Sequence, residues 1–280
     1  MDPSEESLVS TSVQPARQPS LFIPHGGGPC FFMQWTMGPP ETWEKTRAFL
    51  ESIRFSLPET PRALLVISGH WEEDVPTASA AQSPELIYDY SGFPPETYKL
   101  TWPAPGSPEL AGRVQQLLEQ RGLPARLSAT RGYDHGVFVP LKVAFPEANI
   151  PVVTLSLASS LDPALHLAVG SALAPLRNQG VLVIGSGMSF HNLRALFTGG
   201  ARERSEEFDR WLTETVESSA PEREARLREW KKAPHAAFAH PREEHLLPLM
   251  VAAGAAPNSR GRLVFRDCPM GAVISAYRWD

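Results

Sequence analysis

Four of the eight histidines in this chain lie beside glycine-containing turns, and apolar runs lead into three of these turns. The four contexts are Ile23-Pro24-His25-Gly26, Ser68-Gly69-His70, Tyr133-Asp134-His135-Gly136 and Gly187-Met188-Ser189-Phe190-His191. Short apolar runs bounded by glycine are typical of buried parallel strands. Loops that leave the carboxyl ends of parallel strands open into one crevice. We therefore expect the four histidines to converge on a shared site.

The rest of the chain alternates apolar runs with helical patterns. Strands are expected at 20–24, 63–68, 150–157, 181–185, 262–266 and 271–278, and helices near 41–55, 107–121, 162–178, 203–218, 221–232 and 243–253. This alternation predicts a single α/β domain over residues 20–280, with a central, mainly parallel or mixed sheet and helices on both faces. Residues 1–19 are polar and are expected to form a flexible N-terminal tail.

Charge and hydropathy exclude some classes of partner. The net charge is -5 and no basic run is present, which argues against binding to nucleic acid. No apolar run approaches the roughly 18–20 residues that a membrane span requires. The acidic residues near the start argue against a targeting peptide, and two cysteines, Cys30 and Cys268, suggest free thiols. We expect a cytoplasmic protein.

Histidine is both a common ligand for transition metals and a general base near neutral pH. A single histidine in such a turn is more often a satisfied loop residue, but four in similar contexts favour a shared site. His240 is a fifth candidate, since it lies in a loop before an expected helix. His245 lies five residues later, about 140° around that helix, so the two cannot form an i, i+4 zinc grip.

Several motifs, in order along the chain, resemble one known family. They are Pro24-His25-Gly26, Ser68-Gly69-His70-Trp71-Glu72, Tyr88-Asp89-Tyr90-Ser91-Gly92-Phe93-Pro94, Asp134-His135-Gly136, His191-Asn192-Leu193 and Ala239-His240-Pro241 with Glu243-Glu244-His245. From about Ser20 to Trp279 the chain resembles the class III extradiol ring-cleavage dioxygenases of the LigB-like superfamily, in particular the DOPA dioxygenase branch.

The resemblance implies a mononuclear, non-haem Fe(II) site with His25 and His70 as metal ligands. His240 occupies the region of the third ligand, where relatives that cleave protocatechuate carry a glutamate. This departure leaves two alternatives: an all-histidine site, which would also hold zinc, or ligation by Glu243 or Glu244. His240 is the preferred third ligand, because both glutamates fall inside the expected helix. His191 matches the base over the metal and could be a fourth ligand in the substrate-free site. His135 matches a second catalytic histidine of the pocket.

The implied reaction opens the ring of a catecholic substrate, DOPA-like or another catechol, with O2. A zinc-dependent hydrolase and a non-catalytic scaffold of the same fold are the alternatives. Tyr88, Phe93 and Trp102 either wall a ring-binding pocket or pack their own loop onto the sheet. Three cations near the motif histidines either bind a substrate carboxylate or lie on the surface: Arg131, Arg194 and Lys142. The substrate and the oligomeric state stay open at this point.

Overall fold

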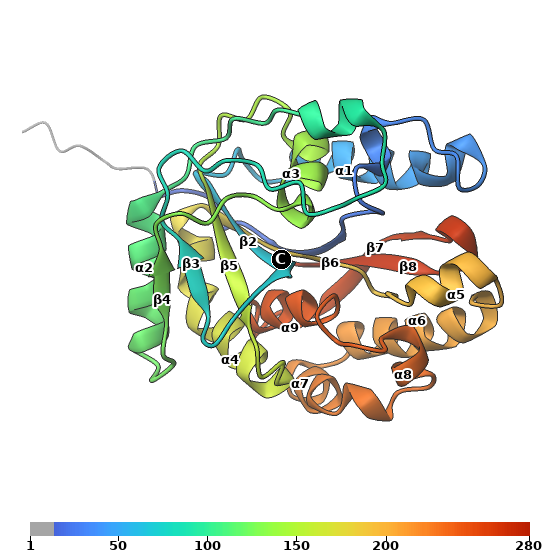
Figure 1. The fold of residues 1–280 in the computed structure, drawn as a ribbon. Coiled ribbons are helices and arrows are strands. Elements are labelled where there is room, and N and C mark those ends of the chain that lie inside the picture. The colour runs from blue at the N-terminus through green and yellow to red at the C-terminus, as the bar shows by residue number, and fades with distance from the viewer. Residues whose placement is uncertain (1–13) are drawn as a thin grey trace, which may run out of the picture.

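The apolar runs form the centre of a mixed sheet in the computed structural model, which describes residues 14–280 (Figure 1). Within that range the sheet has eight strands in the order β4-β3-β5-β2-β6-β1-β8-β7. Their bounds are β1 Ser20–Pro24, β2 Ala63–Glu73, β3 Thr77–Ser79, β4 Arg126–Ser128, β5 Val152–Ala158, β6 Val181–Gly187, β7 Gly261–Asp267 and β8 Ile274–Trp279. The α/β class and the mixed sheet expected from the sequence are confirmed.

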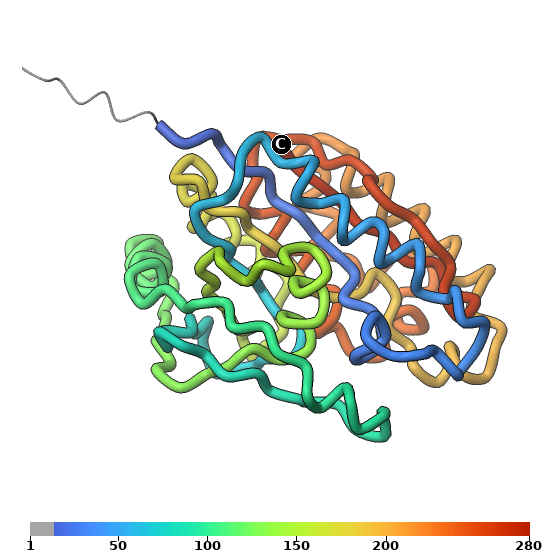
Figure 2. The backbone as a smooth tube through the Cα atoms, turned by 90° about the horizontal axis from the view of Figure 1, so that it is seen from above, coloured from blue at the N-terminus to red at the C-terminus, as the bar shows by residue number. Residues whose placement is uncertain are grey.

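The four central strands run parallel. β2 pairs with β5 on one side and with β6 on the other, and β6 pairs with β1. β8 then runs antiparallel to β1, so the N-terminal strand and the last strand lie side by side (Figure 2). The carboxyl ends of β1, β2 and β6 therefore meet at one edge. His70 lies near the end of β2, and His25 and His191 follow β1 and β6.

Helices cover both faces of this sheet. In Figure 1, α1 and α3 lie on one side and α4, α6 and α9 on the other. The bounds are α1 Glu44–Ser56, α2 Pro108–Glu119, α3 His135–Ala144, α4 Pro163–Leu173, α5 Leu193–Thr198, α6 Arg202–Glu217, α7 Ala220–Arg228, α8 Ala236–Ala239 and α9 Leu247–Gly254. Short 3-10 helices occupy Cys30–Phe32, Pro40–Trp43, Pro95–Lys99, Ala174–Gln179, Trp230–Lys232 and Pro269–Gly271. Among residues 14–280, no helix combines the length and the apolar character that crossing a bilayer requires.

Several helices depart from the sequence expectation. The short helices α5 and α8 lie outside the expected helices, and two further differences bear on the candidate site. α3 was not expected, because it contains Pro140 and all of its side chains except Lys142 are buried, which removes any helical period. The helix expected over 243–253 begins only at Leu247, and residues 241–246 form bends and turns. This second difference moves His245 off the helix and into the turn that precedes it.

The chain begins to pack against the domain before residue 20, where the sequence suggested that the tail ends. Residues 1–13 of the expected tail lie outside the described residues. Gln18 is buried, its backbone N–H donates to the carbonyl of Arg177 (3.0 Å), and the Arg177 Nε donates to the carbonyl of Gln18 (2.8 Å). The buried Arg177 guanidinium also donates to the carbonyl of Trp279 (2.9 Å). This guanidinium thus ties the segment ahead of β1 to the end of β8.

Candidate metal centre and active site

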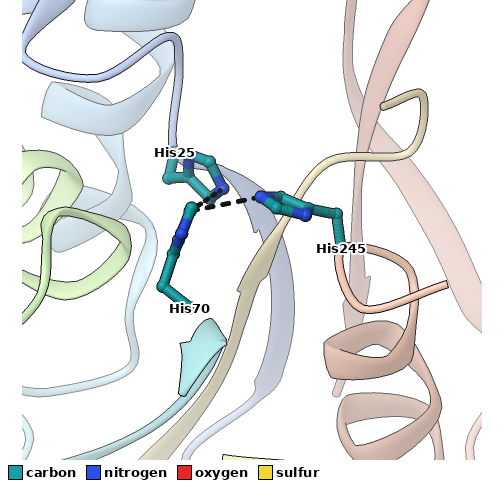
Figure 3. A group of neighbouring side chains, drawn as sticks. All are labelled: His25, His70 and His245. Carbon is teal, nitrogen blue, oxygen red and sulfur yellow. Dashed lines mark hydrogen bonds between the residues drawn. The ribbon is translucent and has the colours of Figure 1, made fainter. Parts of the chain in front are cut away.

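Three histidines from distant parts of the chain bring their Nε2 atoms together (Figure 3). His25 directly follows β1, His70 lies within β2, and His245 lies in the turn before α9. The Nε2 atom of His70 is 3.3 Å from that of His25 and 3.1 Å from that of His245. One ligand atom from each ring lies within 4.8 Å of the other two.

The far side of each ring faces an oxygen acceptor. The Nδ1–H of His25 donates to the carbonyl of Gly26 (2.9 Å), and that of His245 donates to Oε1 of Glu244 (2.9 Å). In His70, Nδ1 is 3.6 Å from a carboxylate oxygen of Asp89. A neutral imidazole that donates through Nδ1 presents a lone pair at Nε2. The lone pairs of His25 and His245 therefore point at the same small volume.

Burial keeps these rings neutral. Desolvation, together with repulsion from neighbouring histidines, holds the pKa of His25 and of His70 well below the ordinary value, and burial lowers the pKa of His245 to about 4. Two nitrogen ligands that are each about 2.0–2.1 Å from one ion in a tetrahedral shell lie about 3.3 Å apart. The observed Nε2 separations of 3.3 and 3.1 Å match this spacing. The donor set therefore fits a single transition-metal ion.

The rings of two more histidines pack against this group. The ring of His191 stacks on that of His245, with centroids 3.4 Å apart and an interplanar angle of 17°. The ring of His135 lies over that of His70, with centroids 3.9 Å apart. His191 lies in a metal-capable group with Glu244 and His245, not with His25 and His70. Its expected role as a fourth ligand stays a prediction.

Two carboxylates orient the outer pair of histidines. Oε1 of Glu244 is 3.4 Å from Nδ1 of His191, and Oδ1 of Asp89 accepts from both Nδ1 (2.9 Å) and the backbone N–H (2.8 Å) of His135. Burial alone would raise the pKa of each carboxyl, but hydrogen bonds from the histidines hold the pKa of Glu244 and of Asp89 below their usual values. Both therefore stay ionised and fix the ring orientations.

His240 lies elsewhere, which corrects the expectation that it is the third ligand. It belongs to none of the metal-capable groups found in residues 14–280. Its buried Nε2–H donates to the carbonyl of Ser189 (3.0 Å), and its ring packs against Phe208 and Trp230. The sequence argument failed because it assumed a helix starting near 243. The turn over 241–246 instead carries His245 to the site.

The two glutamates that the sequence offered as alternative ligands have different surroundings. The carboxylate of Glu243 pairs with Lys231 (2.7 Å). Glu244 lies between His191 and His245 and supports both rings. The sequence did contain the relevant signal, since His245 ends the segment Glu243-Glu244-His245 that carries the family resemblance.

One cavity of about 510 Å³ is lined by five histidines: His25, His70, His135, His191 and His245. Of the three expected pocket aromatics, Phe93 lines it, whereas Tyr88 and Trp102 do not. The Tyr88 hydroxyl donates to the carbonyl of Leu100 (2.6 Å), and buried Trp102 donates through Nε1 to the carbonyl of Phe145 (3.0 Å). Tyr90, another aromatic of the stretch that the sequence offered as a pocket wall, also lines the cavity. Arg131, Arg194 and Lys142 lie outside the lining.

Gly187 sets the position of the His245 turn. A Cβ at Gly187 would lie 2.1 Å from the carbonyl oxygen of His245, which accepts from the N–H of Met188 (3.0 Å). We expect Gly187→Ala to displace this turn and to weaken metal binding about 10- to 100-fold, as loss of supporting contacts does. Metal titration would measure it. Gly112→Ala is the control, because nothing lies within 4 Å of a Cβ there. Unchanged affinity in Gly187→Ala would contradict this account.

The non-ligand histidine His240 makes stability depend on pH. Burial lowers its pKa to about 3 in the folded chain, so the unfolded chain binds a proton near pH 6.5 that the folded chain excludes. Its contribution to stability is therefore complete above about pH 6.5 and falls as the pH drops, by up to about 1.4 kcal/mol per pH unit. In denaturant unfolding of the chelator-treated protein between about pH 4 and 6, His240→Phe should show a shallower slope by about this amount. Equal slopes would contradict the prediction.

Comparison with known proteins identifies the family of this chain. Residues 19–275 match the family model described as the catalytic LigB subunit of aromatic ring-opening dioxygenase. The chain belongs to the LigB family.

The names of two relatives state an activity. The chain is 44% identical to a 4,5-DOPA dioxygenase extradiol of Beta vulgaris, over 78% of this chain and 83% of that one. It is 36% identical to the dioxygenase tasH of Hapsidospora irregularis, over 93% of this chain and 85% of that one. Membership in the family and these relatives make the protein an extradiol ring-opening dioxygenase.

A solved structure shares the fold. The crystal structure of an uncharacterized protein from Escherichia coli K12 superposes with a TM-score of 0.75 at 28% sequence identity. The match covers 94% of this chain and 99% of that one.

Proposed function

We propose that this protein opens the ring of a catechol beside its diol, using one Fe(II) ion held by His25, His70 and His245. The observation that carries the proposal is the convergence of these three neutral Nε2 atoms on the wall of a cavity large enough for an aromatic ring. When bound, Fe(II) would supply open positions and electron transfer that let a diol and dioxygen react. Zinc would fit the same nitrogen donors in the isolated protein.

The reaction balances without an external reductant. The carbon–carbon bond next to the diol and the O–O bond both break, and both atoms of dioxygen enter the product. The catechol carbons are oxidised, and dioxygen is reduced by the same electrons. The product is a muconic semialdehyde type of compound, which absorbs visible light.

His191 is the proposed base for the catechol. Its Nδ1 faces the ionised carboxylate of Glu244, which leaves Nε2 free to accept a phenolic proton. Glu244 then stabilises the imidazolium that results, as a buried carboxylate does beside a histidine base. The stack on His245 keeps the base next to the metal ligands.

His135 is proposed to accept a proton at Nε2 and, once protonated there, to act as an acid. Asp89 accepts from its Nδ1–H and from its backbone N–H, which fixes the ring and its tautomer. Its Nε2, unprotonated in this tautomer, is then free to accept a hydrogen bond or a proton from a hydroxyl of the substrate. Its place over His70, on the cavity wall, supports this role.

We also propose a reducing, cytoplasmic location. Cys30 and Cys268 are both unpaired, and burial raises the pKa of the Cys30 thiol. A protonated, buried thiol packs as a small apolar group and neither binds metal nor attacks substrate. Free cysteines of this kind are typical of reducing compartments.

Oxygen uptake tests the proposed function. The protein is loaded anaerobically with Fe(II), mixed with a panel of catechols and then exposed to isotopically labelled dioxygen. We expect oxygen consumption, growth of visible absorbance and two labelled oxygen atoms in the product, with the zinc-loaded protein inactive. Hydrolysis of amides or esters by the zinc form, with no oxygen uptake by the iron form, would contradict the proposal.

A further inference from the structure

The cavity wall beyond the histidines is almost entirely apolar. Within residues 14–280 its lining includes no lysine, arginine, aspartate or glutamate, and Tyr90 and Ser91 supply its other polar side chains. The apolar side chains that line it are Trp35, Met37, Trp43, Phe93, Met188, Phe190, Leu193, Leu196, Phe197 and Met270. A volume of about 510 Å³ falls within the range of roughly 300–1,000 Å³ for small-molecule sites. Such a cavity accommodates more than one unsubstituted ring.

Exposed apolar side chains gather at this cavity. Of the five large apolar side chains that are exposed in the described part of the chain, three line it: Met37 (43% exposed), Leu193 (55%) and Phe197 (61%). Leu193 and Phe197 are four residues apart on α5, so they lie on the same face of that helix. Apolar groups left in water at the rim of a pocket mark a surface for ligand contact.

The cationic side chains near the cavity either pair with other groups or lie outside its lining. Arg131 donates to the buried carboxylate of Asp134 (2.7 Å) and stacks over Trp71. Lys142 donates to the carbonyl of Thr101 (2.8 Å). Exposed Arg194 is adjacent to Leu193 in sequence but lies outside the lining. A carboxylate on the substrate would therefore lose water in this cavity without gaining a cationic side chain as partner, which is costly.

We propose that the substrate is a catechol with an uncharged, apolar substituent, rather than an amino-acid catechol such as DOPA. The inference rests on the proposed function. The diol lies at the histidines, and the substituent runs over Phe93 toward Leu193 and Phe197 at the rim. The wall thus selects among catechols by their side group, while the histidines react with the diol that all of them share.

Two matched ligands test this preference, one ending in a butyl chain and the other in a carboxylate: butylcatechol and hydrocaffeate. With Fe(II)-loaded protein, kcat/KM should rise about fourfold for each methylene added between ethylcatechol and butylcatechol. It should be at least about tenfold higher for butylcatechol than for hydrocaffeate or L-DOPA. Binding to the zinc-loaded protein without oxygen, measured by quenching of tryptophan fluorescence, should show the same order, because Trp35 and Trp43 line the cavity.

Variants at the rim make the test specific. Phe197→Ser should reduce the butylcatechol-to-hydrocaffeate ratio several-fold, and Phe197→Arg should reduce it further by supplying a cation. Phe55→Ser is the matched control, since Phe55 is exposed (77%) and lies outside the cavity. Equal or tighter binding of hydrocaffeate or L-DOPA by the wild-type protein would overturn the inference and leave the proposed function standing. Selective binding of butylcatechol with no oxygen uptake on any catechol would support the inference and overturn the proposed function.

Discussion

His245→Ala should lose its metal and its activity, whereas His240→Gln should keep both. His245 presents an unprotonated Nε2 to the point that His25 and His70 also face, so its removal leaves two nitrogen ligands. Loss of a supporting contact alone costs about 10- to 100-fold in affinity, and loss of a ligand should cost more than about 100-fold. Metal content of purified protein and titration of the chelator-treated protein would measure this.

The His240→Gln variant is the matched control for that experiment. Glutamine still offers an N–H to the carbonyl of Ser189, which His240 Nε2 bonds at 3.0 Å. We expect this variant to lose about 1–3 kcal/mol of stability from its imperfect fit but to bind one ion per chain. The reverse pattern, with metal lost in His240→Gln and kept in His245→Ala, would make His240 the third ligand and contradict the assignment of His245.

His191→Ala should bind metal but turn over slowly. The side chain faces the cavity and is oriented by Glu244, while the three-histidine group stays complete without it. Loss of a general base typically costs about 10²- to 10⁴-fold in rate, so kcat should fall by that factor. Steady-state oxygen uptake, together with metal analysis of the same sample, separates a loss of rate from a loss of metal.

Added imidazole gives that variant a stricter test. The truncated side chain leaves room beside His245 for a free imidazole, which should restore part of kcat in proportion to its concentration. Phe55→Ala, at an exposed site outside the cavity, should show no such response. A full rate in His191→Ala without imidazole would remove His191 from the reaction.

Sequence patterns predicted the framework of the site well, because the central strands are buried on both faces. The runs before His25, His70 and His191 form β1, β2 and β6, whose carboxyl ends meet. His135 joins them by another route, from the first turn of α3. The sequence could not predict α3, since a helix buried on all sides shows no amphipathic period.

The remaining errors come from loops, where tertiary contacts decide the conformation. The turn over 241–246 is held by the fit between its backbone and Gly187, a contact between segments far apart in sequence. The loop around 88–102 likewise offered several aromatics with no period to rank them. Hydrogen bonds from Tyr88 and Trp102 to distant carbonyls turn these two side chains away from the cavity and leave Tyr90 and Phe93 to line it.

The most direct test is a crystal structure of the metal-loaded protein, with the ion located by its anomalous scattering. The account predicts one ion within about 2.0–2.3 Å of the Nε2 atoms of His25, His70 and His245, with His240 still facing Ser189. An ion bound by His240, or bound away from His25 and His70, would contradict it.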